Sequence, residues 1–327
     1  MKSQLWTEKT ANLNRIVLGL YIHDAELARL HHHEPLLRHS IDRLPHICSD
    51  ELFTAPSPRH WKTLILESQF QNLPAESSLT APISIPSRDR VAQPLPGDFA
   101  LCGMLESISA LACEHAQHEP GSLKSTSLSK CHELLMQWHT QYQPRMSGKS
   151  SWCCLMMLWH SIFIMLHADF NALECACGRE GYGAAQEHLS STRSWVRSVE
   201  AKRCMLHAML IQKNFESLPA GAEPAFHVPL CLYYCGIVWS CFMCFSGDLE
   251  PVTVTAADLA QFGELRLQGI DGVGICLEQT VGLQPRRLAM GSLFRIVDLL
   301  QRINHWKISQ SLASTLLALI EETQDLF

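Results

Sequence analysis

The chain of 327 residues is long enough for one large domain or two ordinary ones, because single hydrophobic cores stop growing at about 250 to 300 residues. Hydrophobic residues make up 47% of the chain and charged residues 18%, which allows a sizeable core and differs from a multi-span membrane protein. The 26 basic and 32 acidic residues leave a net charge of −6, which disfavours unaided binding to nucleic-acid phosphates.

The 14 cysteines do not have the pattern of a disulfide scaffold. Many lie in apolar stretches of a long chain, where buried free thiols are the more frequent outcome. The first residues carry an early acidic side chain, Glu8, and lack the apolar stretch of a signal peptide. We therefore expect the protein in the cytoplasm or the nucleus.

Apolar residues recur at helical spacing through most of the chain. We predict helices over residues 12–30, 61–70, 99–118, 131–142, 150–176, 184–215, 228–245, 288–303 and 308–319. The intervening segments are rich in proline and serine, and we expect an exposed loop or linker over residues 74–98, with further breaks over 120–130 and 219–229. Residues 255–278 are mixed in character, and no alternating pattern is longer than 252–254. The predicted fold class is all-α, a single large multi-helical domain with Pro/Ser-rich loops.

Two stretches, 150–168 and 224–247, contain no Asp, Glu, Lys or Arg and raise the question of a membrane span. The first contains His160 and His167, and the second contains two prolines and Gly236 without a flanking basic cluster. A helix that is apolar on every face is also what the centre of a large helical domain requires. We predict two buried core helices and no membrane insertion.

Several motifs of ligand-binding proteins are present only in part. Gly148-Lys149-Ser150 resembles the end of a phosphate-binding loop, but Gln143 stands where the loop needs its first glycine. Two His-Glu pairs lack the second histidine of a zinc protease, because Leu37 and Met136 occupy the required positions. These fragments therefore indicate neither nucleotide nor metal binding.

A Cys-x-x-Cys pair at Cys241 and Cys244 follows Cys231 and Cys235 within the apolar stretch 228–245. A structural zinc site requires two such pairs on turns, in polar surroundings that favour the thiolate. The residues here are apolar and helical in spacing. We interpret these cysteines as buried thiols on a core helix.

His160, His167 and Asp169 fall near one helical face, with Glu174 further along, which is a pattern compatible with a catalytic triad or a metal site. No nucleophile accompanies them at a recognisable spacing. Our interpretation is that the histidines are core residues that hydrogen-bond to neighbours, and that Asp169 caps a helix or pairs with Arg179. We accordingly predict no catalytic, cofactor-binding or metal-ligating residue, no cofactor and no enzymatic activity.

Two segments resemble a known family. The first comprises residues 15–17, 21–28, 34–37, 44–45 and 49–55 with Trp61. It is similar to the fungal-specific transcription factor domain, or middle homology region. There a helix bearing an Asp precedes Pro-containing segments, a Leu-Phe or Leu-Trp-x-Ala element and a Trp that opens the next helix.

The second segment comprises residues 158–174 and 178–181 and looks like the later helix pair of the same domain, as found in regulators with two-Cys two-His zinc fingers. Residues 305–309, before the last helix, are similar too. The resemblance extends from about residue 12 to residue 320, and none of its elements is a catalytic motif.

The resemblance implies a regulatory domain of a fungal transcription factor that acts in the nucleus on RNA polymerase II genes, including metabolic or secondary-metabolite gene sets. The family reads DNA through a separate zinc module, and no such cysteine pattern precedes Arg15. We therefore expect no direct nucleic-acid binding, and a domain shortened at its N-terminus. Its partners would be the transcription machinery or a DNA-binding paralogue, in a homodimer or heterodimer.

Two other classes of function stay open at this point. A helical metal-binding enzyme would be built around His160, His167 and Cys241 and would require stoichiometric metal. A membrane-associated accessory protein would partition with lipid through the apolar stretches.

Overall fold

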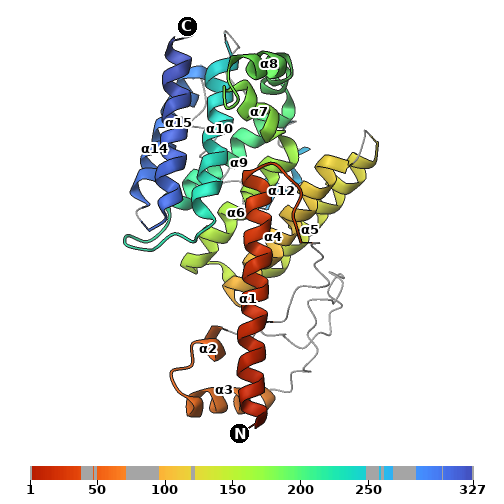
Figure 1. Ribbon diagram of the computed structural model, residues 1–327, viewed down its shortest axis with the longest axis vertical. Helices are drawn as coiled ribbons and strands as arrows, with labels where there is room; N and C mark the ends of the chain where they lie inside the picture. The colour runs from red at the N-terminus through yellow and green to blue at the C-terminus, as the bar shows by residue number, and fades with distance from the viewer. Residues whose placement is uncertain are drawn as a thin grey trace. The chain divides into compact units, whose positions relative to one another are not determined.

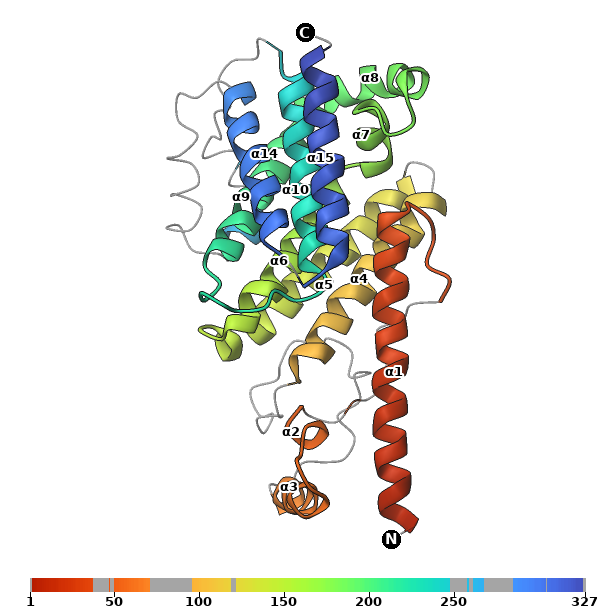
Figure 2. The same cartoon turned by 60° about the vertical axis from the view of Figure 1, so that its left-hand side comes forward.

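The computed structural model describes residues 2–37, 47, 50–70, 96–118, 122–247, 258, 261–267, 285–303 and 305–325. Every regular element in this part of the chain is a helix, which confirms the predicted all-α class. The chain forms two compact units, Met1–Ser147 and Gly148–Phe327. Each unit has its own buried core, and Figures 1 and 2 show the helices of each.

The described residues of the first unit form α1 (Lys2–Leu30), α2 (Asp50–Phe53), α3 (Pro58–Phe70), α4 (Asp98–His118) and α5 (Ser122–Met146). Helix α1 packs on α4, and α4 packs on α5. The buried face of α1 carries apolar side chains three or four residues apart, as an amphipathic helix requires: Leu18, Ile22, Ala25 and Ala28.

The C-terminus of α1 is closed by backbone and side-chain hydrogen bonds. His32 adopts the left-handed conformation with φ 52°, and the His33 amide donates to the Ala28 carbonyl at 3.1 Å. The Asp24 carboxylate then accepts from the amides of Leu36 and Leu37, at 3.0 and 2.9 Å. These bonds turn the chain away from the helix axis just after Pro35.

The second unit contains α6 (Ser150–His167), α7 (Phe170–Ala176), α8 (Tyr182–Val196), α9 (Val199–Glu216), α10 (Val228–Phe245), α12 (Gly263–Arg266), α14 (Pro285–Arg302) and α15 (Lys307–Asp325). Helix α10 contacts α6, α7, α8, α9, α14 and α15, and Figure 1 shows it among the other helices of this unit. Helix α10 can carry apolar residues on every face because the surrounding helices bury them.

Helices α10 and α15 approach closely at Gly236. A Cβ atom at this position would lie 2.4 Å from Cδ1 of Leu316, well inside van der Waals contact. The missing side chain of Gly236 therefore allows the Leu316 side chain to pack directly against the α10 backbone.

Helices α6 and α10 are both long and apolar enough to cross a membrane by length and composition. The most apolar window of α6 is 67% buried inside the protein, and that of α10 is 94% buried. Burial in the unit core accounts for their composition, as predicted for core helices.

The boundaries differ from prediction where short capping signals interrupt an apolar pattern. The helix predicted over 150–176 is two helices, because Ala168 is extended and Asp169 caps α7. The helix predicted over 184–215 divides at Ser198, whose side chain accepts from the Ala201 amide. The break predicted over 120–130 is shorter, since α5 begins at Ser122, and most of the loop predicted over 74–98 lies outside the described residues.

A charge inside α10 should unfold the second unit. Ile237 is 0% exposed, so Ile237→Asp places an unpaired carboxylate in the core at a cost of several kcal/mol, against a total stability of about 5 to 15 kcal/mol. Circular dichroism and soluble yield should both show the loss. The matched control is Ile308→Asp, because Ile308 is 42% exposed in the first turn of α15 and should tolerate the change. Equal behaviour of the two variants would contradict the core position of α10.

Candidate functional site

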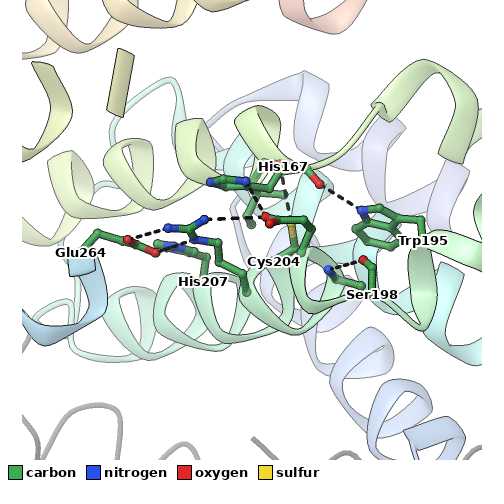
Figure 3. A network of polar contacts seen from close by, with 10 residues as sticks. His167, Trp195, Ser198, Cys204, His207 and Glu264 are labelled. Atoms are coloured by element: carbon green, nitrogen blue, oxygen red, sulfur yellow. Dashed lines mark hydrogen bonds and ion pairs between the residues drawn. The ribbon is translucent and has the colours of Figure 1, made fainter. Parts of the chain in front are cut away.

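A buried polar network connects α6, α9 and α12 in the second unit (Figure 3). Nδ1 of His160 lies 2.8 Å from Nδ1 of His207, and Nε2 of His207 lies 3.4 Å from Oε1 of Glu264. Arg203 donates to the same carboxylate through Nε at 2.7 Å and Nη2 at 2.9 Å. His160, His207 and Glu264 are each 0% exposed and Arg203 is 9% exposed, so this part of the network is buried in the core.

The protonation of this network follows from its geometry. Burial lowers the pKa of His207, although the hydrogen bond to Glu264 opposes the shift, so the imidazole is neutral at pH 7. We assign the His207 proton to Nε2, which faces the Glu264 carboxylate, and this leaves the lone pair of Nδ1 to accept from Nδ1–H of His160. The charge of Glu264 is balanced by Arg203.

Aromatic rings enclose the histidine pair. The ring of Phe163 stacks on His207 with centroids 5.0 Å apart and an interplanar angle of 2°, and Trp159 meets His160 edge-on at 4.9 Å. The guanidinium of Arg203 also lies over the ring of Phe262, 5.0 Å from its centroid. This packing fixes the two imidazole rings and the proton between them, and it keeps the rings buried, out of reach of a molecule in solution.

The outer edge of the network reaches His167. Nδ1 of His167 lies 2.6 Å from Oε2 of Glu200, and the same oxygen lies 3.7 Å from Nη1 of Arg203. The hydrogen bond from His167 lowers the pKa of Glu200. The indole of Trp195 donates to the His167 carbonyl at 2.9 Å, as Figure 3 shows. His160 and His167 thus have different partners, and only His160 is the core histidine that we expected, because His167 is partly exposed.

Asp169 and Glu174 make local structural contacts. Asp169 caps α7 by accepting from the Ala172 amide at 3.1 Å, which is one of its two predicted roles. Arg179 pairs with Glu174 at 2.6 Å and also donates to Asn171. The structure therefore does not bring His160, His167, Asp169 and Glu174 together into one site.

The cysteines of α10 bond within the core. Cys231 donates to the Ser161 hydroxyl at 3.4 Å, and Cys235 donates to backbone carbonyls. Sγ of Cys241 lies 3.7 Å from Sγ of Cys177. Cys177, Cys231, Cys235 and Cys241 are buried and not in disulfides, whereas Cys244, also predicted to be buried, is only partly buried. Within the described ranges no three His, Cys, Asp or Glu side chains are grouped to hold a metal ion.

The first unit contains a second buried charge cluster that the sequence motifs do not reveal. Nη2 of Arg29 lies 2.7 Å from Oε1 of Glu106, and these side chains are 0% and 1% exposed. Burial raises the pKa of Glu106 to about 6. Burial, aided by the Glu106 charge, raises the pKa of the neighbouring Glu26 to about 8. Two carboxylates beside one guanidinium therefore carry less than two negative charges at pH 7.

A sequence signal for this cluster exists. Arg29 continues the spacing of the buried residues Leu18, Ile22 and Ala25 along α1. A charged residue therefore occupies a position on the apolar face of the helix. Such a residue needs a buried partner of opposite charge. Nothing in the sequence identifies Glu106 of α4 as that partner, because the pairing depends on how two helices pack.

The surface hollow beside α8 shares no residue with either cluster. It is lined by Gln186, Leu189, Ser190, Arg193 and Ser194 of α8 and by Arg197, which caps the end of that helix. Comparison with known proteins gives no further guide, since no protein family, curated protein or solved structure matches this chain. The polar clusters therefore have to be interpreted from their own geometry.

Removing one partner of the Arg203–Glu264 pair should be costly. Arg203→Leu leaves a buried carboxylate without its main counter-charge and should destabilise the second unit by about 3 to 5 kcal/mol in urea denaturation. The double variant Arg203→Leu/Glu264→Leu should recover much of this loss. Arg295→Leu at the exposed Arg295–Glu216 pair serves as the control and should cost less than about 1 kcal/mol. A double variant no more stable than Arg203→Leu would contradict the assigned charge state.

Glu26 should make the first unit less stable at alkaline pH. Burial raises the pKa of Glu26 from 4.5 to about 8 in the folded protein, so the stability that its protonated form contributes is fully present below about pH 4.5 and is lost progressively as the pH rises from 4.5 to 8. Glu26→Gln stays neutral and should gain more than about 1 kcal/mol relative to wild type between pH 5 and 8.5.

Urea denaturation of both proteins across this pH range measures the difference directly. The titration of His139, whose pKa burial lowers to about 4, is common to both proteins and cancels. Glu133→Gln, at an exposed position of α5, is the matched control. A constant difference between wild type and Glu26→Gln from pH 5 to 8.5 would argue against a neutral Glu26.

Proposed function

We propose that this chain is a non-enzymatic regulatory domain of a fungal transcription factor, which acts in the nucleus on RNA polymerase II genes through protein partners. The proposal rests on the resemblance of residues 15–61 and 158–181 to the fungal-specific transcription factor domain. A homodimer or heterodimer with a DNA-binding paralogue is the arrangement that fits a chain of net charge −6.

The observation that carries the proposal is the structural use of the charged residues in the resembling segments. Arg15 pairs with Asp50 and stacks on the ring of Phe53 at 3.9 Å, so it joins α1 to α2. Asp24 closes the end of α1 by accepting from two amides. A domain whose distinctive polar residues join helices is suited to binding and regulation rather than to bond-breaking chemistry.

The charged residues of the second segment also make structural contacts. Asp169 caps α7, and Glu174 pairs with Arg179. A metal-binding enzyme built on His160, His167 and Cys241 would need these side chains around one ion, whereas each has a different neighbour: His207, Glu200 and Cys177, respectively. The contacts therefore support the regulatory proposal over that alternative.

A tethering assay tests the proposal. The full chain is fused to an unrelated DNA-binding module and expressed in a fungal host with a reporter that carries the cognate site. We expect reporter transcription to change several-fold relative to the module alone, and the fusion to accumulate in the nucleus. The change should be lost with Ile237→Asp and kept with Ile308→Asp. A folded fusion that leaves the reporter at the level of the module alone would refute the proposed function.

The isolated chain should also fail to recognise DNA by itself. Its charge repels phosphates, and we assign no DNA-reading element to it. A gel-shift series at low salt with random and promoter fragments measures this. Sharp binding to one fragment that survives competitor DNA would contradict action through a separate DNA-binding partner.

A further inference from the structure

Three cysteines meet where the end of α7 contacts α10, and we refer to Cys177, Cys241 and Cys244 as the thiol cluster. Cys177 is the C-terminal capping residue of α7, and its Sγ lies 3.7 Å from that of Cys241. Cys244 lies one turn beyond Cys241 on α10, near enough to Cys177 to influence the pKa of that thiol. The two helices thus bring Cys177 together with two thiols that lie 64 residues or more beyond it in the sequence.

Other buried thiols of this unit have oxygen acceptors. Cys204 donates to the Ile164 carbonyl at 3.7 Å, and Cys235 donates to the Cys231 carbonyl at 3.2 Å. The thiol cluster differs because sulfur faces sulfur. A disulfide has an S–S length of about 2.05 Å, so each sulfur of the Cys177–Cys241 pair would move by less than about 1 Å to form one.

The three thiols differ in exposure. Cys241 is 0% exposed and Cys177 is 6% exposed, whereas Cys244 is only partly buried at the end of α10. An oxidant in solution therefore reaches Cys244 first. We propose that the thiol cluster is an oxidation site, in which a peroxide reacts at Cys244 and the final product is a Cys177–Cys241 disulfide.

The steps balance with hydrogen peroxide as the oxidant. The sulfur of Cys244 attacks the peroxide, the O–O bond breaks, and a sulfenic acid forms with release of one water. The Cys177 sulfur attacks the sulfenic sulfur, the S–O bond breaks, and a second water leaves with the thiol proton. The Cys241 sulfur then attacks Cys177, and its proton passes to the departing Cys244 thiolate. In sum, two thiols and one peroxide give one disulfide and two waters.

The electrostatics of Cys177 agree with this order of events. Its hydrogen bond with Cys241 and its burial raise the pKa of Cys177 well above the ordinary value of 9.0. Cys177 therefore stays a thiol at neutral pH and reacts poorly with a peroxide directly. It reacts instead with a sulfenic acid held beside it, where proximity replaces nucleophilic strength.

Peptide mapping of the reduced full chain tests the proposal. The protein is exposed to hydrogen peroxide, quenched with an alkylating reagent and digested without reductant. We expect a linked pair of peptides containing Cys177 and Cys241, which disappears on treatment with dithiothreitol. Cys241→Ser should instead trap a Cys177–Cys244 link, and Cys244→Ser should slow cross-linking by at least tenfold. Cys235→Ser, a change at a buried thiol outside the cluster, should leave the rate unchanged.

Two results would overturn the proposal. The first is the absence of any link within the cluster at a peroxide dose that oxidises the partly buried Cys153, which has no place in the scheme. The second is cross-linking of Cys244→Ser at the wild-type rate, which would remove Cys244 from the reaction. The wild-type map needs no substitution, so the first result does not depend on whether a variant folds.

Discussion

The second unit depends on the enclosure of α10. This helix carries apolar side chains on all its faces, and its stability requires that neighbours remove nearly all of that surface from water. Among the described residues, helices α6, α7, α8, α9, α14 and α15 contact it, and they come from both sides of α10 in the sequence. The surrounding helices are therefore arranged so that together they cover α10 and keep its apolar surface away from solvent.

Enclosing α10 leaves few places for charge in the second unit, and there the buried Arg203 is paired with Glu264, much as Arg29 is paired with Glu106 in the first unit. Arg203 with Glu264 and Arg29 with Glu106 each join two helices that are distant in sequence. Such pairs add little net stability, because desolvation offsets their attraction, but a wrong helix alignment would leave each charge alone. They therefore select one packing among the many that apolar contacts alone would permit.

Much of the fold follows from local patterns, whereas the polar clusters do not. Residues 228–245 are predicted and observed as one helix, because a long apolar run between prolines and a glycine has few alternatives. The divisions at Asp169 and Ser198 escape prediction, since a single capping side chain outweighs an otherwise continuous apolar pattern. The His160–His207 contact joins residues 47 positions apart, and no spacing rule connects them.

The close approach at Gly236 also constrains how this protein can change over evolutionary time. The Leu316 side chain occupies the space that any Cβ at position 236 would need. A larger residue at position 236 is compatible with the same helix spacing only when position 316 becomes smaller, because neither backbone can move without disturbing other contacts of α10. Positions 236 and 316 should accordingly vary together among related sequences, so that their combined volume is conserved while their identities are not.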